Sequence, residues 1–308
     1  MSVIKTNSTK AWILAARPKT LAAAIVPVLV GCALACYYCA FQWIPALACL
    51  LFAMLMQVAA NFINDLFDYL KGSDGEDRLG PLRATAQGWI SMAAMKKGIF
   101  LVILLACLIG STLIFYGGWE MILVGCFCVA FACFYTSGPY PLAYNGLGDI
   151  AVIVFFGLVA VGFTCYVQIK PLYWTNVIVF SGLATGMVVN TLLVLNNYRD
   201  RDTDRKAGKR TVIVRLGEPF GRYLYLFSGV LAVITVCVAF CFEKNIEFTS
   251  GSFCSPFFTL FYLIPHFLTW RKICKIREGK ALNALIGETS RNMLFFALLL
   301  SIGLIVCR

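Results

Sequence analysis

The sequence predicts an all-α integral membrane protein with nine transmembrane helices, its N-terminus inside and its C-terminus outside. Of the 308 residues, 60% are hydrophobic and only 13% are charged, which is more apolar side chain than a soluble domain of this size can bury. Apolar runs of about 20 residues, long enough for a helix to cross a hydrocarbon core of ~30 Å, recur along the whole chain. The distribution of basic residues between these runs gives the orientation.

Each apolar run is expected to be a helix, because backbone polar groups in lipid have to be paired within the segment. The runs are continuous rather than alternating, which disfavours a β-barrel. The first run lacks a small-residue cleavage site after a short apolar core, so we expect it to be retained. In order, the predicted segments are 20–40, 44–65, 97–115, 120–137, 149–169, 174–196, 223–242, 253–270 and 292–307.

Lysine and arginine sort by loop. With the N-terminus inside, the inner segments hold 23 of the 26 basic residues, and the outer ones hold only Lys170, Lys244 and Arg308. This positive-inside pattern predicts the topology. The net charge of +11 is therefore interpreted as a topology signal that also faces anionic lipid head groups, not as a nucleic-acid-binding surface. Membrane lipid is the expected partner, and nucleic acid is not.

The cysteines and the single histidine receive no functional role. Nearly all of the 14 cysteines lie in apolar segments, where they behave as small hydrophobic residues. Cys36 and Cys39 form one CxxC, but no second pair completes a zinc site. His266 lies near the end of an apolar segment, where a packing or interfacial role is the more common one.

Eight of the 15 acidic residues fall into two short clusters that follow the inner ends of the second and sixth predicted helices. On a helix, the spacing i, i+3, i+4, i+7 or i, i+3, i+7 places side chains on one face. Carboxylates so close together repel one another unless a cation lies between them, and hard oxygen ligands beside a phosphate suit Mg²⁺. The two polar stripes are Asn61, Asn64, Asp65 and Asp68, and Asn197, Asp200 and Asp204.

The two clusters also resemble each other, which predicts a weak internal repeat within a single domain, 1–308. In each, residues 61–77 and 196–210, asparagines precede an aspartate pair and a basic, glycine-containing loop follows. Two such units facing each other would enclose one anionic ligand. The neighbouring basic side chains favour a diphosphate as that ligand.

Two further stretches are candidates for the same site. Arg17 and Lys19 flank Pro18 at the start of the first helix, and they either anchor it at the interface or reach the anion. The inner loop 135–148 carries no net basic charge but is rich in tyrosine, glycine and proline, which favours a pocket lining. Tyr135 and Tyr140 are the candidates for stabilising a developing carbocation through their aromatic faces.

At these residues the chain resembles the UbiA family of intramembrane prenyltransferases, from Arg17 to about Gly217. Within the family it is most similar to the branch of 1,4-dihydroxy-2-naphthoate polyprenyltransferases of menaquinone synthesis. The stretches that carry the resemblance are RPKTLAAAIVPVLVG, NDLFDYLKGSDGEDRLGPLR, YTSGPYPLAYNGLGD and NNYRDRDTDRKAGKRTVIVRLG.

The resemblance implies a helical bundle around a central cavity, with Mg²⁺ at the two aspartate stretches. Its implied metal ligands are Asn64, Asp65, Asp68, Asp74, Asp200 and Asp204, assisted by Asn197. The basic residues implied to hold the diphosphate are Lys71, Arg83, Lys209 and Arg210. Two positions depart from the family pattern: Gly72 stands where a third aspartate is common, and Ala143 stands where many members carry a lysine.

The expected activity is Mg²⁺-dependent transfer of a polyprenyl group from polyprenyl diphosphate to 1,4-dihydroxy-2-naphthoate, with loss of CO₂ and diphosphate, giving demethylmenaquinone. A polyprenyl tail resides in lipid at ~0.8 kcal/mol per buried CH₂, so the site is expected in the bacterial cytoplasmic membrane, open to the cytoplasm. The alternatives are another acceptor, such as 4-hydroxybenzoate or homogentisate, and, in a different class, an ion-coupled transporter.

Overall fold

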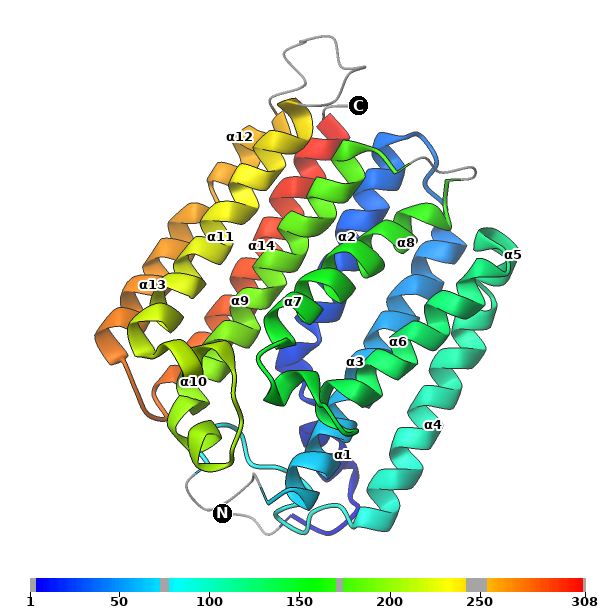
Figure 1. Ribbon diagram of the computed structural model, residues 1–308. Coiled ribbons are helices and arrows are strands. Elements are labelled where there is room, and N and C mark those ends of the chain that lie inside the picture. The colour runs from blue at the N-terminus through cyan, green and yellow to red at the C-terminus, as the bar shows by residue number, and fades with distance from the viewer. Residues whose placement is uncertain (1–3, 73–77, 170–173, 242–253, 307–308) are drawn as a thin grey trace.

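The computed structural model describes residues 4–72, 78–169, 174–241 and 254–306, and all regular structure in these ranges is helical (Figure 1). The long helices run side by side along one common direction. In chain order the elements are α1 (Thr9–Ala16), η1 (Pro18–Thr20), α2 (Ala22–Tyr37), α3 (Trp43–Leu70), α4 (Met92–Ser111), α5 (Ile114–Gly117), α6 (Glu120–Thr136), η2 (Leu142–Tyr144), α7 (Gly148–Val152), η3 (Ile153–Val159), α8 (Ala160–Tyr166), α9 (Asn176–Lys206), α10 (Val212–Leu216), α11 (Glu218–Cys241), α12 (Cys254–Leu260), α13 (Leu263–Ile276) and α14 (Leu282–Val306).

Each of the nine predicted apolar segments coincides with one helix or with a run of consecutive helices. Within the described ranges, six helices are long and apolar enough to cross a membrane, or seven when α1–η1 and α2, bent by 50°, count as one span. The helix α6, with 17 residues, is shorter than these, and α12 and α13 are two separate pieces. The chain is thus an all-helical integral membrane protein, while nine spans and the N-in, C-out topology stay predictions.

The helices α3 and α9 extend beyond the apolar runs from which they were predicted. The run ending at residue 65 continues as helix to Leu70, and the run ending at 196 continues to Lys206. At 1.5 Å per residue the 31-residue α9 is about 46 Å long, well beyond the ~30 Å of hydrocarbon. Asp65 and Asp68, and Asp200 and Asp204, therefore lie on regular helix, as their spacing predicted.

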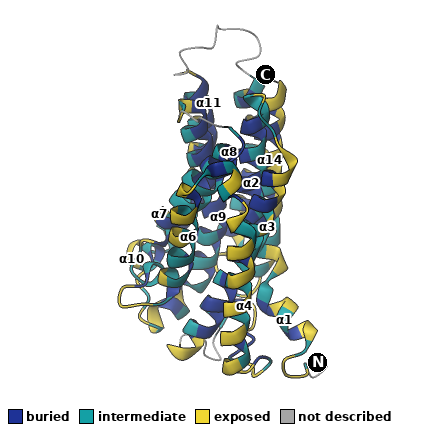
Figure 2. Cartoon of the chain, turned by 90° about the vertical axis from the view of Figure 1, so that its right-hand side faces the viewer, coloured by how far each residue is buried: buried dark blue, intermediate teal, exposed yellow. Residues whose placement is uncertain are grey.

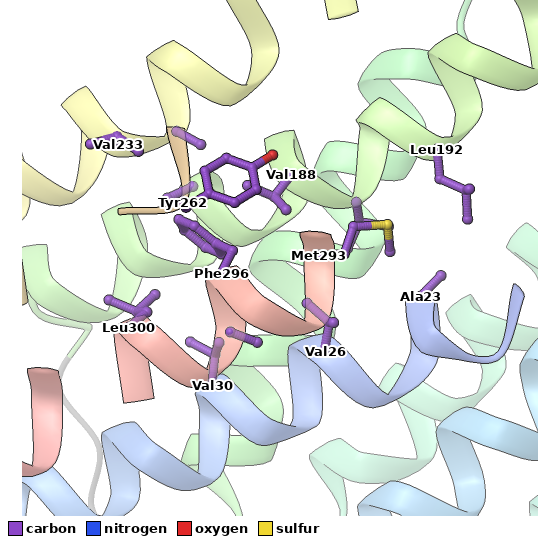
Figure 3. Packing of buried hydrophobic residues seen from close by; sticks show 14 of the residues in the cluster. Ala23, Val26, Val30, Val188, Leu192, Val233, Tyr262, Met293, Phe296 and Leu300 are labelled. Carbon is purple, nitrogen blue, oxygen red and sulfur yellow. The ribbon is translucent and has the colours of Figure 1, made fainter. Parts of the chain in front are cut away.

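The largest buried core joins α2, α9, α11 and α14. Figure 3 shows Val26 and Val30 of α2, Val188 of α9, and Met293 and Phe296 of α14 pointing into a common apolar interior. All five side chains are fully buried. This core fixes α9, and with it the second aspartate stretch, against the rest of the bundle.

His266 of α13 is part of the packing, in agreement with the absence of a functional signal around it. Its ring lies between the rings of Tyr225 and Tyr262, with centroids at 4.8 Å and 5.1 Å. Its Nδ1 is 3.1 Å from the Tyr262 hydroxyl, and its Nε2 is 3.1 Å from the Leu226 carbonyl oxygen. Both ring nitrogens are thus partnered in the core.

The π-helical η3 lies in direct backbone contact with α9. A Cβ added to Gly186 would lie 2.4 Å from the Ile153 carbonyl oxygen, and one added to Gly157 would lie 2.5 Å from the Gly182 carbonyl oxygen. Small residues permit this close approach between membrane helices. The contact holds Phe155 of η3 beside α9, in the wall of the cavity described below.

Candidate active site

The C-terminal ends of α3 and α9, which carry the two aspartate stretches, lie at the same end of the bundle (Figure 1). An added Cβ on Gly80 would lie 2.7 Å from Nη2 of Arg199, so the loop after α3 passes directly over a residue of the second stretch. Asn283, next to the start of α14, holds both: its amide accepts from Arg199 and donates to the Leu79 carbonyl oxygen. The two stretches therefore belong to one polar site.

Asp68 is the most connected side chain of this site. Arg83 donates from Nη2 to its Oδ2 at 2.6 Å, and the Tyr144 hydroxyl donates to its Oδ1 at 2.8 Å. The Lys209 ammonium lies 3.5 Å from the same Oδ1. Asp68 and Arg83 are only 3% and 6% exposed, so this charge pair is desolvated and depends on its geometry.

Lys209 joins the two aspartate stretches. Its Nζ is 3.5 Å from Oδ1 of Asp68 on α3 and 3.5 Å from Oδ1 of Asp204 on α9. Two buried carboxylates so near to each other are stable only with positive charge between them, which this ammonium supplies. The position between Asp68 and Asp204 is therefore one that attracts a cation.

Tyr144 is the centre of the basic part of the site. The Nζ atoms of Lys71 and Lys209 lie 4.1 Å and 4.8 Å from the centroid of its ring, within cation–π range. Lys71 also donates to the Thr136 carbonyl oxygen at 2.6 Å. Partial burial lowers the pKa of Lys71, and the Asp68 carboxylate acts in the opposite direction. Two predicted diphosphate-binding lysines thus share one aromatic platform.

Sequence reasoning missed Tyr144 and selected other tyrosines of the same loop. The signal was present, because Tyr144 directly follows Ala143, the position at which the family lysine is absent. Lys71 and Lys209, from other elements, supply positive charge beside this point of the loop.

We expect Tyr144→Phe to lower turnover roughly tenfold, because it removes the hydrogen bond to the Asp68 carboxylate but keeps the ring beneath the two lysines. Tyr140→Phe is the matched control, since the Tyr140 side chain lies on the surface and is 60% exposed. Initial rates of product formation for the two variants check the prediction. Equal rates in both would contradict it.

Asp200 is held by its neighbour in sequence. Arg199 donates from Nε and Nη2 to the two oxygens of Asp200, at 2.8 Å and 2.6 Å. The Asp200 side chain is 20% exposed, which leaves it more accessible than Asp68. Asp200 and Asp204 lie one helical turn apart on α9, so both face the same region.

Asp65 fastens the loop that carries Arg83. Its Oδ2 accepts the backbone N–H of Ala84 and its Oδ1 accepts that of Thr85, each at 2.9 Å. With 1% of its surface exposed, this carboxylate is almost completely enclosed. It positions Arg83 toward Asp68 through the loop backbone.

Asparagines beside both aspartate pairs line the central cavity. Asn64 lines the central cavity and accepts a hydrogen bond from the Thr136 hydroxyl. The α9 asparagine that lines the cavity is Asn196, whereas the predicted Asn197 is not part of that lining. The spacing contains a signal for this, because Asn64 precedes Asp68, and Asn196 precedes Asp200, by four residues.

The remaining predicted site residues differ in whether they line the cavity. Arg17 and Tyr135 line the cavity. Tyr140 does not line it. The backbone N–H of Arg210 donates to the Tyr144 carbonyl oxygen at 2.8 Å, while the Arg210 side chain is exposed. Asp74 lies outside the described residues.

A cavity of about 590 Å³ adjoins this polar site between α2, α3, α4, α6, η3, α8 and α9. Arg17, Asn64 and Asn196 mark its polar end, and its remaining wall is mainly apolar. Phe131 and Phe155 stack in that wall with centroids 3.6 Å apart. A largely apolar cavity with a few convergent polar groups is the usual form of a small-molecule site.

The carboxylates of the site can meet the needs of a magnesium ion. Among the described residues, no three His, Cys, Asp or Glu side chains lie close enough together to form a metal cage. Magnesium, however, binds through one or two carboxylates and takes its other ligands from water and substrate phosphate. Asp68 and Asp204, on either side of one cationic nitrogen, satisfy that smaller requirement.

Comparison with known proteins gives a consistent result. The UbiA prenyltransferase family matches residues 24–281. The chain is 35% identical over 310 residues to the 1,4-dihydroxy-2-naphthoate octaprenyltransferase of Haemophilus influenzae, covering 96% of each chain. It is 37% identical over 241 residues to the protein of the same name from Escherichia coli, covering 76% of each.

Among solved structures, a UbiA homolog from Archaeoglobus fulgidus bound to GPP and Mg²⁺ has the same fold. The TM-score is 0.66, at 17% sequence identity, and the match covers 96% of this chain and 99% of that one. The all-helical bundle therefore has a fold already seen in a solved structure.

Proposed function

We propose that this chain, which belongs to the UbiA prenyltransferase family, transfers a polyprenyl group to 1,4-dihydroxy-2-naphthoate in menaquinone biosynthesis. The observation that carries the proposal is the similarity, along almost the whole of both chains, to a dihydroxynaphthoate octaprenyltransferase. The geometry supports the proposal, because the charged site adjoins an apolar cavity. The charged site suits the ionic head of the donor, and the cavity suits its hydrocarbon tail.

The diphosphate head of the donor would lie at the basic side of the site. Arg83, Lys71 and Lys209 converge there around Asp68 and Tyr144. Positive groups fixed at the place where negative charge develops stabilise a leaving group, usually the largest catalytic contribution. These side chains would hold the diphosphate as its bond to the allylic carbon breaks.

Magnesium is the cofactor that the donor set fits. Asp68, Asp200 and Asp204 would hold it together with Asn64, and when bound it would supply positive charge to the departing diphosphate. Asp65 is also a proposed metal ligand, but its oxygens are less available to a metal ion, because each already accepts a backbone N–H. The Mg²⁺-bound relative of the same fold supports this use of a divalent metal.

The aromatic wall of the cavity would protect the allylic carbon after the C–O bond breaks. Tyr135, Phe131 and Phe155 lie in that wall, and aromatic faces attract developing positive charge. An electron-rich ring carbon of the naphthoate then forms the new C–C bond, and the ring carboxylate leaves as CO₂. Apolar side chains keep water from capturing the allylic carbon first.

The proposed location is the bacterial cytoplasmic membrane, with the charged end of the bundle toward the cytoplasm. The basic residues of 78–97 and 199–222 lie at that end, and the excess of lysine and arginine there supports this orientation.

An acceptor panel tests the proposed function directly. Membranes that contain the protein would be incubated with Mg²⁺, a labelled polyprenyl diphosphate and, separately, 1,4-dihydroxy-2-naphthoate, 4-hydroxybenzoate or homogentisate. We expect labelled demethylmenaquinol with dihydroxynaphthoate, recovered as demethylmenaquinone after oxidation by air, and loss of product when a chelator removes the metal. Transfer only to another acceptor would reassign the chain within the family, and cation-dependent uptake without diphosphate release would exclude transfer altogether.

A further inference from the structure

The helix α14, on which no site residue was predicted, contacts the charged end of the bundle. It has a buried face and an exposed face (Figure 2). Asn283 and Ser290 are seven residues apart, so both lie on one face of the helix. Asn283 donates to the carbonyl oxygen of Leu79, and Ser290 donates to that of Lys19, at 2.8 Å and 3.0 Å. The first half of α14 therefore holds two segments that carry predicted site residues.

Asn283 joins the two aspartate stretches through one amide group. Its Oδ1 accepts a hydrogen bond from Nη1 of Arg199 at 2.9 Å, and its Nδ2 donates to the carbonyl oxygen of Leu79 at 2.8 Å. A guanidinium only donates and a carbonyl oxygen only accepts, so this position needs an acceptor and a donor on one side chain. A carboxylate lacks the donor, and an ammonium lacks the acceptor. An amide satisfies both contacts.

The first contact completes the hydrogen bonding of Arg199. This guanidinium donates from Nε and Nη2 to the two oxygens of Asp200, and only 3% of its side chain is exposed. Asn283 accepts from the remaining nitrogen, Nη1. A planar guanidinium that is held at all three nitrogens has little freedom to turn, so the counter-charge of Asp200 stays in one place.

The second contact holds the loop that follows α3. Leu79 is four residues before Arg83, which donates to Asp68 at 2.6 Å. On the other side of Arg83, Asp65 accepts the backbone N–H groups of the next two residues. Arg83 thus stands between two anchors, with Asn283 before it and Asp65 after it.

We propose that Asn283 is a positioning residue for the prenyl diphosphate and its metal ion. By linking Arg199 to the loop at Leu79, it keeps the two aspartate-bearing halves of the site in register for one shared ligand. This inference rests on the proposed prenyl transfer. Asn283 acts through Arg199 and through the loop that carries Arg83. Its loss would leave the aspartates on their helices but allow their counter-charges to move.

Binding in the absence of acceptor tests this role apart from the chemical step. Geranyl diphosphate is titrated calorimetrically into the purified protein at a series of Mg²⁺ concentrations, for wild type and three variants of Asn283. Asn283→Leu has a similar volume but neither donor nor acceptor. Asn283→Asp keeps the acceptor for Arg199 and loses the donor to Leu79, and Asn283→Gln keeps both groups on a longer side chain.

The matched control is Asn292→Leu, at the other asparagine within the last two-thirds of α14. Asn292 lies nine residues further along the helix, which is about 13 Å from Asn283 at 1.5 Å per residue. Its amide also makes two hydrogen bonds, to the Pro265 carbonyl oxygen and to the Thr269 hydroxyl, both on α13. The two substitutions therefore remove similar contacts, but only one of them touches the charged site.

We expect Asn283→Leu to raise the Kd of geranyl diphosphate, and the Mg²⁺ concentration that supports half-maximal binding, roughly tenfold, as for the loss of other groups that orient metal ligands. Asn283→Asp should lie between this variant and wild type, because it releases only the loop. Asn283→Gln should recover part of the affinity. Asn292→Leu should lower the thermal stability of the protein and keep the wild-type Kd.

A wild-type Kd in Asn283→Leu would overturn the inference while leaving the proposed function intact. An equal rise of Kd in Asn292→Leu would also overturn it, because the effect would then be a general loosening of α14. If Asn283→Leu does not fold, a wild-type Kd in Asn283→Asp overturns the inference equally. A wild-type chain that binds no geranyl diphosphate in the presence of Mg²⁺ would overturn the proposed function and this inference with it.

Discussion

Replacing Asp68 with asparagine should lower prenyl transfer by at least roughly 10³-fold, because it removes several kcal/mol of charge stabilisation at the diphosphate. The asparagine has the same shape but no charge. It cannot balance Arg83 and Lys209 together, and it is a weaker ligand for a divalent cation. Steady-state rates at saturating magnesium, measured on membranes with equal amounts of protein, check the prediction.

The control for Asp68→Asn is Asp202→Asn. Asp202 lies in the second acidic cluster, but its side chain is 59% exposed and its ion pairs with Arg201 and Arg205 are loose, at 3.7 Å and 3.5 Å. We expect wild-type rates for that variant. Wild-type activity in Asp68→Asn would show that the charge of this carboxylate is not needed for transfer.

Asp68→Asn also leaves the Arg83 guanidinium buried beside a neutral partner, which destabilises folded proteins. The double variant Asp68→Asn, Arg83→Gln removes that unpaired charge. We expect it to recover protein abundance in the membrane without recovering transfer. This outcome separates the chemical role of the carboxylate from its structural role.

The positions of the aspartates could be predicted from the sequence because helical periodicity determines which side chains share a face. The spacing of Asp65 and Asp68, and of Asp200 and Asp204, survives in α3 and α9, since both helices continue past the end of the hydrocarbon. Composition likewise predicts an all-helical membrane protein. These properties are local, and the sequence carries them directly.

Contacts between elements could not be predicted in the same way. Periodicity places Asn196 and Asn197 on a helix but does not give the rotation of α9 about its axis, so the cavity-facing asparagine was missed. The choice between Tyr140 and Tyr144 depends on how a loop folds back over Asp68. The role of Asp65 depends on a loop whose backbone returns to α3 nineteen and twenty residues later.

The number of membrane spans depends on contacts between elements in the same way. An apolar run shows that a segment prefers lipid, but not whether one straight helix crosses it. The described part of the segment 253–270 divides into α12 and α13, whereas α4 and the short α5 together form one candidate span, Met92–Gly117. Such breaks depend on packing against neighbouring helices, which the sequence pattern of one segment does not contain.

Lys209→Gln should lower prenyl transfer roughly 10²-fold, because the variant loses a positive group at the place where the leaving group gains charge. Lys209 lies 3.5 Å from both Asp68 and Asp204 and so bridges the two carboxylates. We expect the KM for the prenyl diphosphate to rise and kcat to fall. Lys275→Gln, on the exposed surface of α13, is the control and should leave both constants unchanged.

The dependence on magnesium distinguishes a direct role of Lys209 from a structural one. In the structure its ammonium lies between two carboxylates that are proposed to hold the metal, so it competes with a cation for that position. Its removal should lower the Mg²⁺ concentration needed for half-maximal activity even as turnover falls, since the carboxylates then lack their internal counter-charge. Damage to the fold alone would lower turnover without strengthening the response to magnesium. This expectation means that Lys209 passes from the carboxylates to the diphosphate when metal and donor bind. A higher magnesium requirement in Lys209→Gln would exclude that exchange of partners.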